Sequence, residues 1–167
     1  MNIVVIRVGE ISRFPPAISL VNALLDLGHN VTLLANDVKN LPLRMVNRDG
    51  LHLVDFGERG SRLRNFVHIV TDHELIKNYL HEYKDEIDLV WATTDLSARA
   101  AGNELLDFPY VLQLSELVEY VPLLKGSDSR LHYRNIENLA RRASRVVVPE
   151  YNRAHIQQAY WNLPRLP

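Results

Sequence analysis

The stretch MNIVVIRVGEISRFPPAISLVNALLDLGHNVTLLA, residues 1–35, decides the fold class of this chain. A β-branched apolar run at 3–8 is followed by a helix-length segment that opens on Pro15-Pro16, and then by a second apolar run at 31–35. Proline suits the first turn of a helix because its missing N–H has no helical partner there, and Gly28 suits the position just past a helix end. This order predicts two parallel strands joined by a crossover helix.

The same alternation continues along the chain. Further strands are expected at 51–56, 89–92, 110–114 and 146–148, and further helices at 95–106, 131–143, 152–161 and 71–86, where Thr71-Asp72-His73-Glu74 has the form of a capping box. The pattern predicts a three-layer α/β/α sandwich with a mostly parallel sheet of about six strands. The apolar circumference of the first helix predicts deep burial, and 39–65 and 119–130 are predicted as long surface loops.

Composition excludes several classes of protein. The chain has 167 residues, 47% of them hydrophobic, which suits one α/β domain or half of a two-domain enzyme. A net charge of −1 gives no sign of nucleic-acid binding. The absence of cysteine excludes disulfides, thiolate metal sites and a cysteine nucleophile. No apolar run approaches the roughly 18 residues of a membrane span, so we expect a cytoplasmic protein.

Ligands of open parallel sheets lie beyond the carboxyl ends of the strands. The first strand is followed by Gly9-Glu10-Ile11-Ser12-Arg13, which leads into a helix N-terminus whose free amides and dipole can hold an anion. Arg13 stands where a phosphate clamp would lie. The alternatives are a tight turn at Gly9 and a solvated charge at Arg13.

Two other loops carry candidate polar residues. Thr94 and Asp95 follow the fourth strand, and either of them could simply cap the next helix. Ser115 and Glu116 follow the fifth strand, where a carboxylate could meet a sugar hydroxyl or activate a nucleophile. A plain surface acid is the alternative for Glu116.

Familiar motifs are absent from the sequence. Gly9 lacks the second and third glycines of a dinucleotide fingerprint, and no Gly-Lys-Ser/Thr occurs. Lys77 stands where a zincin would have its second histidine, and Ser115 lacks the flanking glycines of a hydrolase nucleophile. Two basic stretches remain: 39–64 has six basic and three acidic residues, and 125–145 has six and two. They are either solvated faces or a surface for an anionic membrane.

Taken together, these elements resemble the N-terminal domain of GT-B glycosyltransferases of the family 4, or group 1, type. The resemblance spans nearly the whole chain and rests on Gly9, Pro15-Pro16-Ala17, the LGHNVTLL of 27–34, the DLVW of 88–91, the QLSEL of 113–117 and the ASRVVVP of 143–149. It implies a single Rossmann-like domain over 1–167. The donor-binding C-terminal domain would be missing, so we expect this chain alone to be inactive.

The resemblance also implies roles for residues. Amides around Gly9 and Glu10 would approach the pyrophosphate of a nucleotide-sugar donor when the cleft closes. The acceptor, a glycan or a lipid-linked sugar, would be contacted by Glu10, Arg13, Thr94, Asp95, Ser115 and Glu116. Asp95 and Glu116 are the candidates for a catalytic role, although no histidine follows the fourth strand as it does in some relatives. No metal or other cofactor is expected in this domain.

The basic stretches would suit docking to a lipid-linked acceptor at the inner membrane face. Two other readings stay open. One is a fragment of a nucleotide-sugar 2-epimerase with the same two-domain build, and the other is a non-catalytic binding module of flavodoxin-like shape.

Overall fold

A computed structural model of the chain describes residues 1–57, 62–116 and 127–167, with the side chains of 62–70, 127–130 and 132 left out of the description. Its elements, in chain order, are β1 (Asn2–Glu10), η1 (Ile11–Arg13), α1 (Pro15–Asp26), β2 (Asn30–Asn36), η2 (Val38–Asn40), α2 (Leu43–Val46), β3 (Leu51–Asp55), α3 (Arg62–Glu82), η3 (Lys84–Glu86), β4 (Leu89–Ala92), α4 (Asp95–Ala101), η4 (Gly102–Asp107), β5 (Tyr110–Gln113), α5 (Ser127–Arg142), β6 (Arg145–Val147) and α6 (Tyr151–Trp161), where η denotes a 3₁₀ helix.

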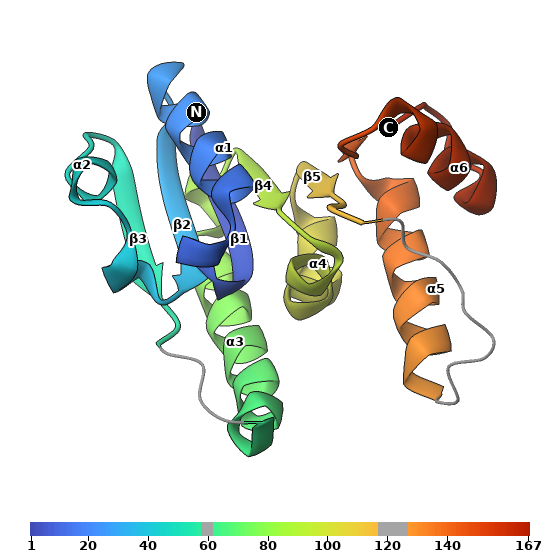
Figure 1. Ribbon diagram of the computed structural model, residues 1–167, viewed down its shortest axis with the longest axis horizontal. Coiled ribbons are helices and arrows are strands. Elements are labelled where there is room, and N and C mark those ends of the chain that lie inside the picture. The colour runs from blue at the N-terminus through green and yellow to red at the C-terminus, as the bar shows by residue number, and fades with distance from the viewer. Residues whose placement is uncertain (58–61, 117–126) are drawn as a thin grey trace.

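The strands form one six-stranded sheet in the order β3-β2-β1-β4-β5-β6, and every pairing is parallel. Successive strands are added from β1 toward β3 on one side of the sheet and from β4 toward β6 on the other. The carboxyl ends of β1 and β4 therefore form the topological switch point. Figure 1 shows α5 and α6 at the β5 side of the molecule, far from β3. The predicted α/β sandwich with a parallel sheet of about six strands is confirmed.

Alternate side chains of each strand pack into two cores, one on each face of the sheet. One core joins the sheet to α1 and α2 through residues that include Ile3, Val5, Val21, Leu24, Leu33 and Met45. The other joins it to α3, α4, α5 and α6 through residues that include Ile6, Ile76, Val90, Ala98, Ile136 and Trp161. Two small side chains of α4, Ala98 and Ala101, are fully buried in this core.

The end of α1 follows its expected pattern. The N–H of Gly28 donates to Leu25 O at 3.0 Å, the N–H of His29 donates to Leu24 O at 3.1 Å, and Gly28 has a φ of +78°. These paired bonds form a Schellman cap. The expected deep burial of the helix is wrong, however. Only one side of α1 faces the sheet, and Leu27 is 71% exposed.

Two other helices depart from the sequence prediction. The capping box at 71–74 is wrong, because α3 already begins at Arg62 and therefore holds Thr71 in its interior. The helix expected at 95–106 ends at Ala101, where Gly102 with φ +61° turns the chain into η4. The loop expected at 39–65 contains η2 and α2 as well as β3, and the one at 119–130 lies mostly outside the described residues.

Candidate functional site at the carboxyl ends of β1, β4 and β5

The candidate residues that follow β1, β4 and β5 lie at one edge of the sheet. β1 pairs with β4, and β4 pairs with β5, so the loops after these strands are neighbours. Gly9 and Glu10 end β1 and Arg13 lies in η1, while Thr94 and Asp95 begin α4. Ser115 and Glu116 follow β5. The topology therefore brings all seven candidate residues to the carboxyl edge.

The β1 loop is shaped by Gly9, which has a φ of +114°. The strand register shifts between Arg7 and Glu10, so that Glu10 pairs with Asn36 and the two residues between are bulged. The N–H of Gly9 donates to Asn36 Oδ1 at 2.9 Å. An anion that used this amide would have to displace the Asn36 side chain.

Asn36 joins Gly9 to two further segments. Its Nδ2 donates to Asp72 Oδ1 of α3 and to the carbonyl of Gly57, each at 3.4 Å, and the side chains of Asn36 and Asp72 are both fully buried. Sequence reasoning missed this network. The available signal was an asparagine at the end of an apolar strand, a position where an apolar residue would otherwise be expected.

The approach to α1 offers fewer amides than the sequence suggests. Pro15 and Pro16 have no N–H, and the N–H of Ala17 donates to Phe14 O at 3.0 Å. In place of an open loop, η1 brings Arg13 into an ion pair with Glu10. The Arg13 side chain is 80% exposed. The contact of Gly9 and Glu10 with a donor phosphate stays a prediction.

Thr94 has a structural role at the start of α4. Its Oγ1 accepts the N–H of Ser97 at 3.1 Å, which makes it the N-cap, and it also bonds Ser97 Oγ at 2.9 Å. Ser97 Oγ in turn accepts the N–H of Val8 at 3.1 Å, so the cap ties α4 to the end of β1. Thr94 is 7% exposed. The neighbouring Asp95 is the first residue of α4 and is partly exposed.

Ser115 and Glu116, the two residues described after β5, are bonded to Arg153 of α6. Arg153 Nη1 donates to Ser115 O at 3.0 Å and to Glu116 Oε2 at 3.1 Å, while its Nε lies 3.4 Å from Glu150 Oε2. The Glu116 side chain is 85% exposed. Ser115 Oγ is buried without a hydrogen-bond partner among the described residues. Sequence reasoning missed Arg153, which lies 37 residues from Glu116.

Tyr110 of β5 and Tyr133 of α5 have raised pKa values and lie away from this edge. Burial raises the pKa of Tyr110 to about 12, an effect that the nearby Arg142 partly offsets. Burial also raises the pKa of Tyr133, which packs edge-on against Trp161. These groups belong to the packed core and carry no sign of proton transfer.

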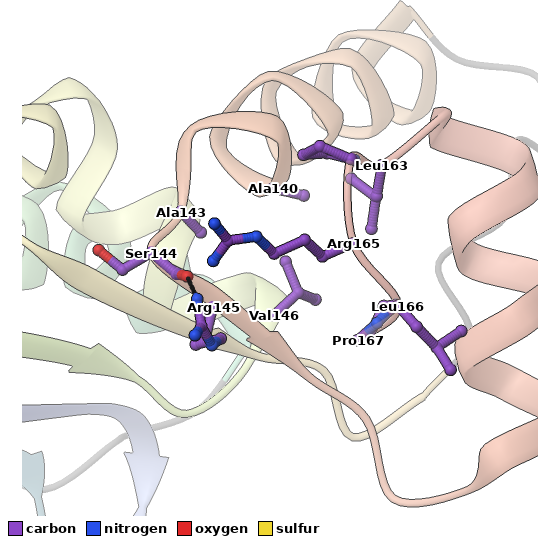
Figure 2. Close-up of a pocket in the computed structure, with 10 residues that line it drawn as sticks. Ala140, Ala143, Ser144, Arg145, Val146, Leu163, Arg165, Leu166 and Pro167 are labelled. Atoms are coloured by element: carbon purple, nitrogen blue, oxygen red, sulfur yellow. Dashed lines mark hydrogen bonds between the residues drawn. The ribbon is translucent and has the colours of Figure 1, made fainter.

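Cavities lie elsewhere in the molecule. The cavity in Figure 2, of about 330 Å³, lies at the amino end of β6 between Ala143, Val146 and the final residues Leu163 to Pro167. Another of about 340 Å³ lies between α3, η4 and α5, beside His73 and Asn138. Within residues 1–57, 62–116 and 127–167, no three His, Asp or Glu side chains are grouped to hold a metal ion. No helix in that part of the chain is long and apolar enough to cross a membrane.

Comparison with solved structures identifies the fold. UGT89C1 of Arabidopsis thaliana, complexed with UDP, superposes with a TM-score of 0.67 at 10% identity over 99% of this chain and 50% of that chain. Sucrose-phosphate synthase from Thermosynechococcus elongatus superposes with a TM-score of 0.67 at 18% identity, over 99% of this chain and 46% of that one. A shorter chain of that synthase gives a TM-score of 0.64 at 14% identity and is covered over 84% of its length.

These neighbours are GT-B glycosyltransferases, and the chain has the fold of one GT-B half. It spans about half the length of UGT89C1 and of the longer synthase chain. No protein-family model matches the sequence. No curated protein matches it either.

Proposed function

We propose that this chain is the N-terminal, acceptor-binding domain of a GT-B glycosyltransferase of the family 4, or group 1, type. The whole protein would transfer a hexosyl group from a nucleotide-sugar donor to a glycan or lipid-linked acceptor in polysaccharide biosynthesis. Two observations support the proposal. The fold covers 99% of this chain but only half of a glycosyltransferase complexed with UDP, and the predicted polar loops lie on three adjacent strands at one edge.

The acceptor would bind along that edge. Glu10, Asp95 and Glu116 supply carboxylates that accept hydrogen bonds from sugar hydroxyls, and Asp95 and Glu116 are the candidates for proton transfer. Arg13, Thr94 and Ser115 complete the proposed contacts, although Thr94 already uses its hydroxyl as a helix cap. Ser115 has a buried hydroxyl without a hydrogen-bond partner among the described residues, and this oxygen is the contact that we propose for it.

Donor chemistry would come from the partner domain. A second Rossmann-like domain, C-terminal to 1–167, would bind the nucleotide sugar, and the Gly9–Glu10 loop would approach its pyrophosphate without a metal ion. Because the Gly9 N–H donates to Asn36 Oδ1, the approach would require this N–H to leave Asn36 and donate to the phosphate instead. The isolated chain is proposed to be inactive.

Membrane contact is a separate part of the proposal. Arg48 of the first basic stretch pairs with Asp26 at 2.6 Å, and Arg141 of the second pairs with Glu137 at 2.8 Å, so part of each stretch is neutralised locally. Exposed arginines such as Arg44 remain to face an anionic leaflet. Co-sedimentation with vesicles that contain or lack phosphatidylglycerol tests this contact, and equal sedimentation with both would reject it.

The decisive test of the function uses the intact protein with a panel of nucleotide sugars and p-nitrophenyl glycosides. We expect transfer with at least one pair, and a loss of about a hundredfold in kcat/KM in Asp95→Asn or Glu116→Gln, the range of a general acid or base. Lys84→Gln is the control, because Lys84 pairs with Asp107 at the amino edge of the sheet.

The other readings give different results. Interconversion of a nucleotide sugar without an acceptor would indicate an epimerase. Binding without turnover in any combination would indicate a non-catalytic module. Either result would overturn the glycosyltransferase proposal.

A further inference from the structure

We infer that Arg153 of α6 is a positioning residue of the acceptor site and that the Arg153–Glu116 pair selects uncharged acceptor sugars with vicinal hydroxyls. The inference rests on the proposed function and extends it in two ways. It adds α6 to a site that sequence reasoning had confined to the loops after β1, β4 and β5. It also specifies the charge of the sugar that this end of the site would accept.

The contacts of Arg153 fix two consecutive residues at once. One guanidinium nitrogen, Nη1, donates both to the backbone oxygen of Ser115 and to the carboxylate of Glu116. Without the second of these bonds, a carboxylate that is 85% exposed would sample many rotamers. With it, the direction of Glu116 is set before a ligand arrives, which is the condition for a preorganised site.

Arg153 is itself held in place. Its side chain is 30% exposed, and Glu150 at the N-cap of α6 pairs with its Nε. The helix behind it is anchored by Ala154, Gln157 and Trp161, which are 2%, 0% and 0% exposed. The packed helix therefore orients the arginine, and the arginine orients Ser115 and Glu116.

The free atoms of the pair define the ligand. In the part of the chain that the structure describes, Glu116 Oε1 and Arg153 Nη2 have no hydrogen-bond partner, so an acceptor and a donor lie next to each other. Adjacent hydroxyls of a sugar ring match such a pair, because one can donate to the carboxylate while its neighbour accepts from the guanidinium.

Charge favours a neutral sugar. Two carboxylates, Glu116 and Glu150, surround the single guanidinium of Arg153, so the cluster carries a net negative charge. A uronic acid or a sugar phosphate at this position would meet like charge. A neutral hexose would not.

The test is binding of p-nitrophenyl hexosides, and of p-nitrophenyl glucuronide as the anionic probe, to the intact protein by saturation-transfer NMR titration. For the tightest neutral hexoside we expect Arg153→Gln to raise Kd about tenfold. Arg153→Lys should raise Kd less than Arg153→Gln does, because lysine keeps the positive charge but lacks the planar N–H donors of the guanidinium. Glu116→Gln should also raise Kd, and the Arg153→Gln, Glu116→Gln double variant should bind no more weakly than the weaker single variant. Lys84→Gln should bind like the unaltered protein.

Each result decides the matter. If no glycoside binds the unaltered protein, the proposed function fails, and this inference fails with it. If a hexoside binds but Arg153→Gln leaves its Kd unchanged, the proposed function stands and the positioning role is wrong. Effects of Arg153→Gln and Glu116→Gln that simply add would also overturn it, because a merely structural arginine would act independently of Glu116. Tighter binding of the glucuronide than of any hexoside would overturn the selection of neutral sugars.

Discussion

Asn36 Oδ1 accepts the backbone N–H of Gly9 at 2.9 Å, and this contact joins the end of β2 to the loop at the end of β1. The Nδ2 of the same Asn36 side chain donates to Asp72 of α3 and to the carbonyl of Gly57. A buried side chain therefore sets the shape of the loop that the proposed donor phosphate would approach. The orientation of its amide follows from its partners, because the oxygen must face the N–H and the nitrogen must face the two oxygens.

Replacement of Asn36 by Leu should destabilise the protein by about 1–3 kcal/mol, because the Gly9 N–H and the buried Asp72 would each lose a partner. Urea unfolding measures the change. The matched control is Asn30→Ala, which removes only an exposed side-chain bond to Asn2, and should cost less than about 0.5 kcal/mol. Equal costs for the two variants would show that the buried network contributes nothing of its own.

Thr94→Ala should cost about 1 kcal/mol through loss of the N-cap of α4. Thr94→Ser keeps the hydroxyl that accepts the N–H of Ser97 and should retain both the stability and the acceptor KM of the intact enzyme. Chemical unfolding and acceptor titrations of the two variants separate these roles. A Thr94→Ser variant that is stable but binds the acceptor poorly would show that the methyl group contacts the sugar and that capping is not its whole role.

Gly9→Ala should cost about 1–3 kcal/mol, because a φ of +114° is strained for any residue with a Cβ. Space is not the obstacle, since the nearest atom to an added Cβ would be Arg7 Nη2 at 3.6 Å. Gly28→Ala is the comparison: Gly28 also has a positive φ but lies in the cap of α1, away from the carboxyl edge. We expect both variants to lower the thermal midpoint and only Gly9→Ala to lower kcat/KM of the intact enzyme. If Gly28→Ala lowers kcat/KM by as much, the loss at Gly9 reflects stability alone.

The fold was predictable because its signals are local and repeated. Runs of β-branched residues separated by helix-length segments indicate parallel strands wherever they occur, and a glycine such as Gly28 marks a helix end by its own backbone preference. The Thr71–Glu74 pattern failed because the same spacing also fits the inside of a long helix. Asp72 is kept there by a contact with Asn36, 36 residues away, which no local pattern could reveal.

The place of the candidate residues in the fold was predictable, but their contacts were not. Strand order places the loops after β1, β4 and β5 together, so the topological rule locates Glu10, Asp95 and Glu116 at one edge. Whether a polar side chain there is available to a ligand depends on long-range partners. Arg153 and Asn36 were missed for that reason, since each acts on a segment distant in the sequence.

Tyr110 gives a prediction about pH. Its hydroxyl donates to Leu139 O of α5 at 2.5 Å, and burial raises its pKa to about 12, compared with about 10 in an unfolded chain. Between those values the unfolded chain has lost this proton while the folded protein still holds it, so the stability that Tyr110 contributes is fully present below pH 10 and falls as the pH rises toward 12.

Tyr110→Phe isolates this contribution from those of the other tyrosines. The variant loses one buried hydrogen bond and should be less stable by about 0.5–1.5 kcal/mol at pH 8. The difference from the unaltered protein should then shrink with increasing pH between 10 and 12, because only the unaltered protein must keep Tyr110 protonated in order to stay folded. Urea unfolding of both proteins at pH 8, 10 and 11 measures the difference. A difference that stays constant over this range would mean that the Tyr110 hydroxyl ionises as easily in the folded protein as in the unfolded chain, and its burial against Leu139 would then have no electrostatic consequence.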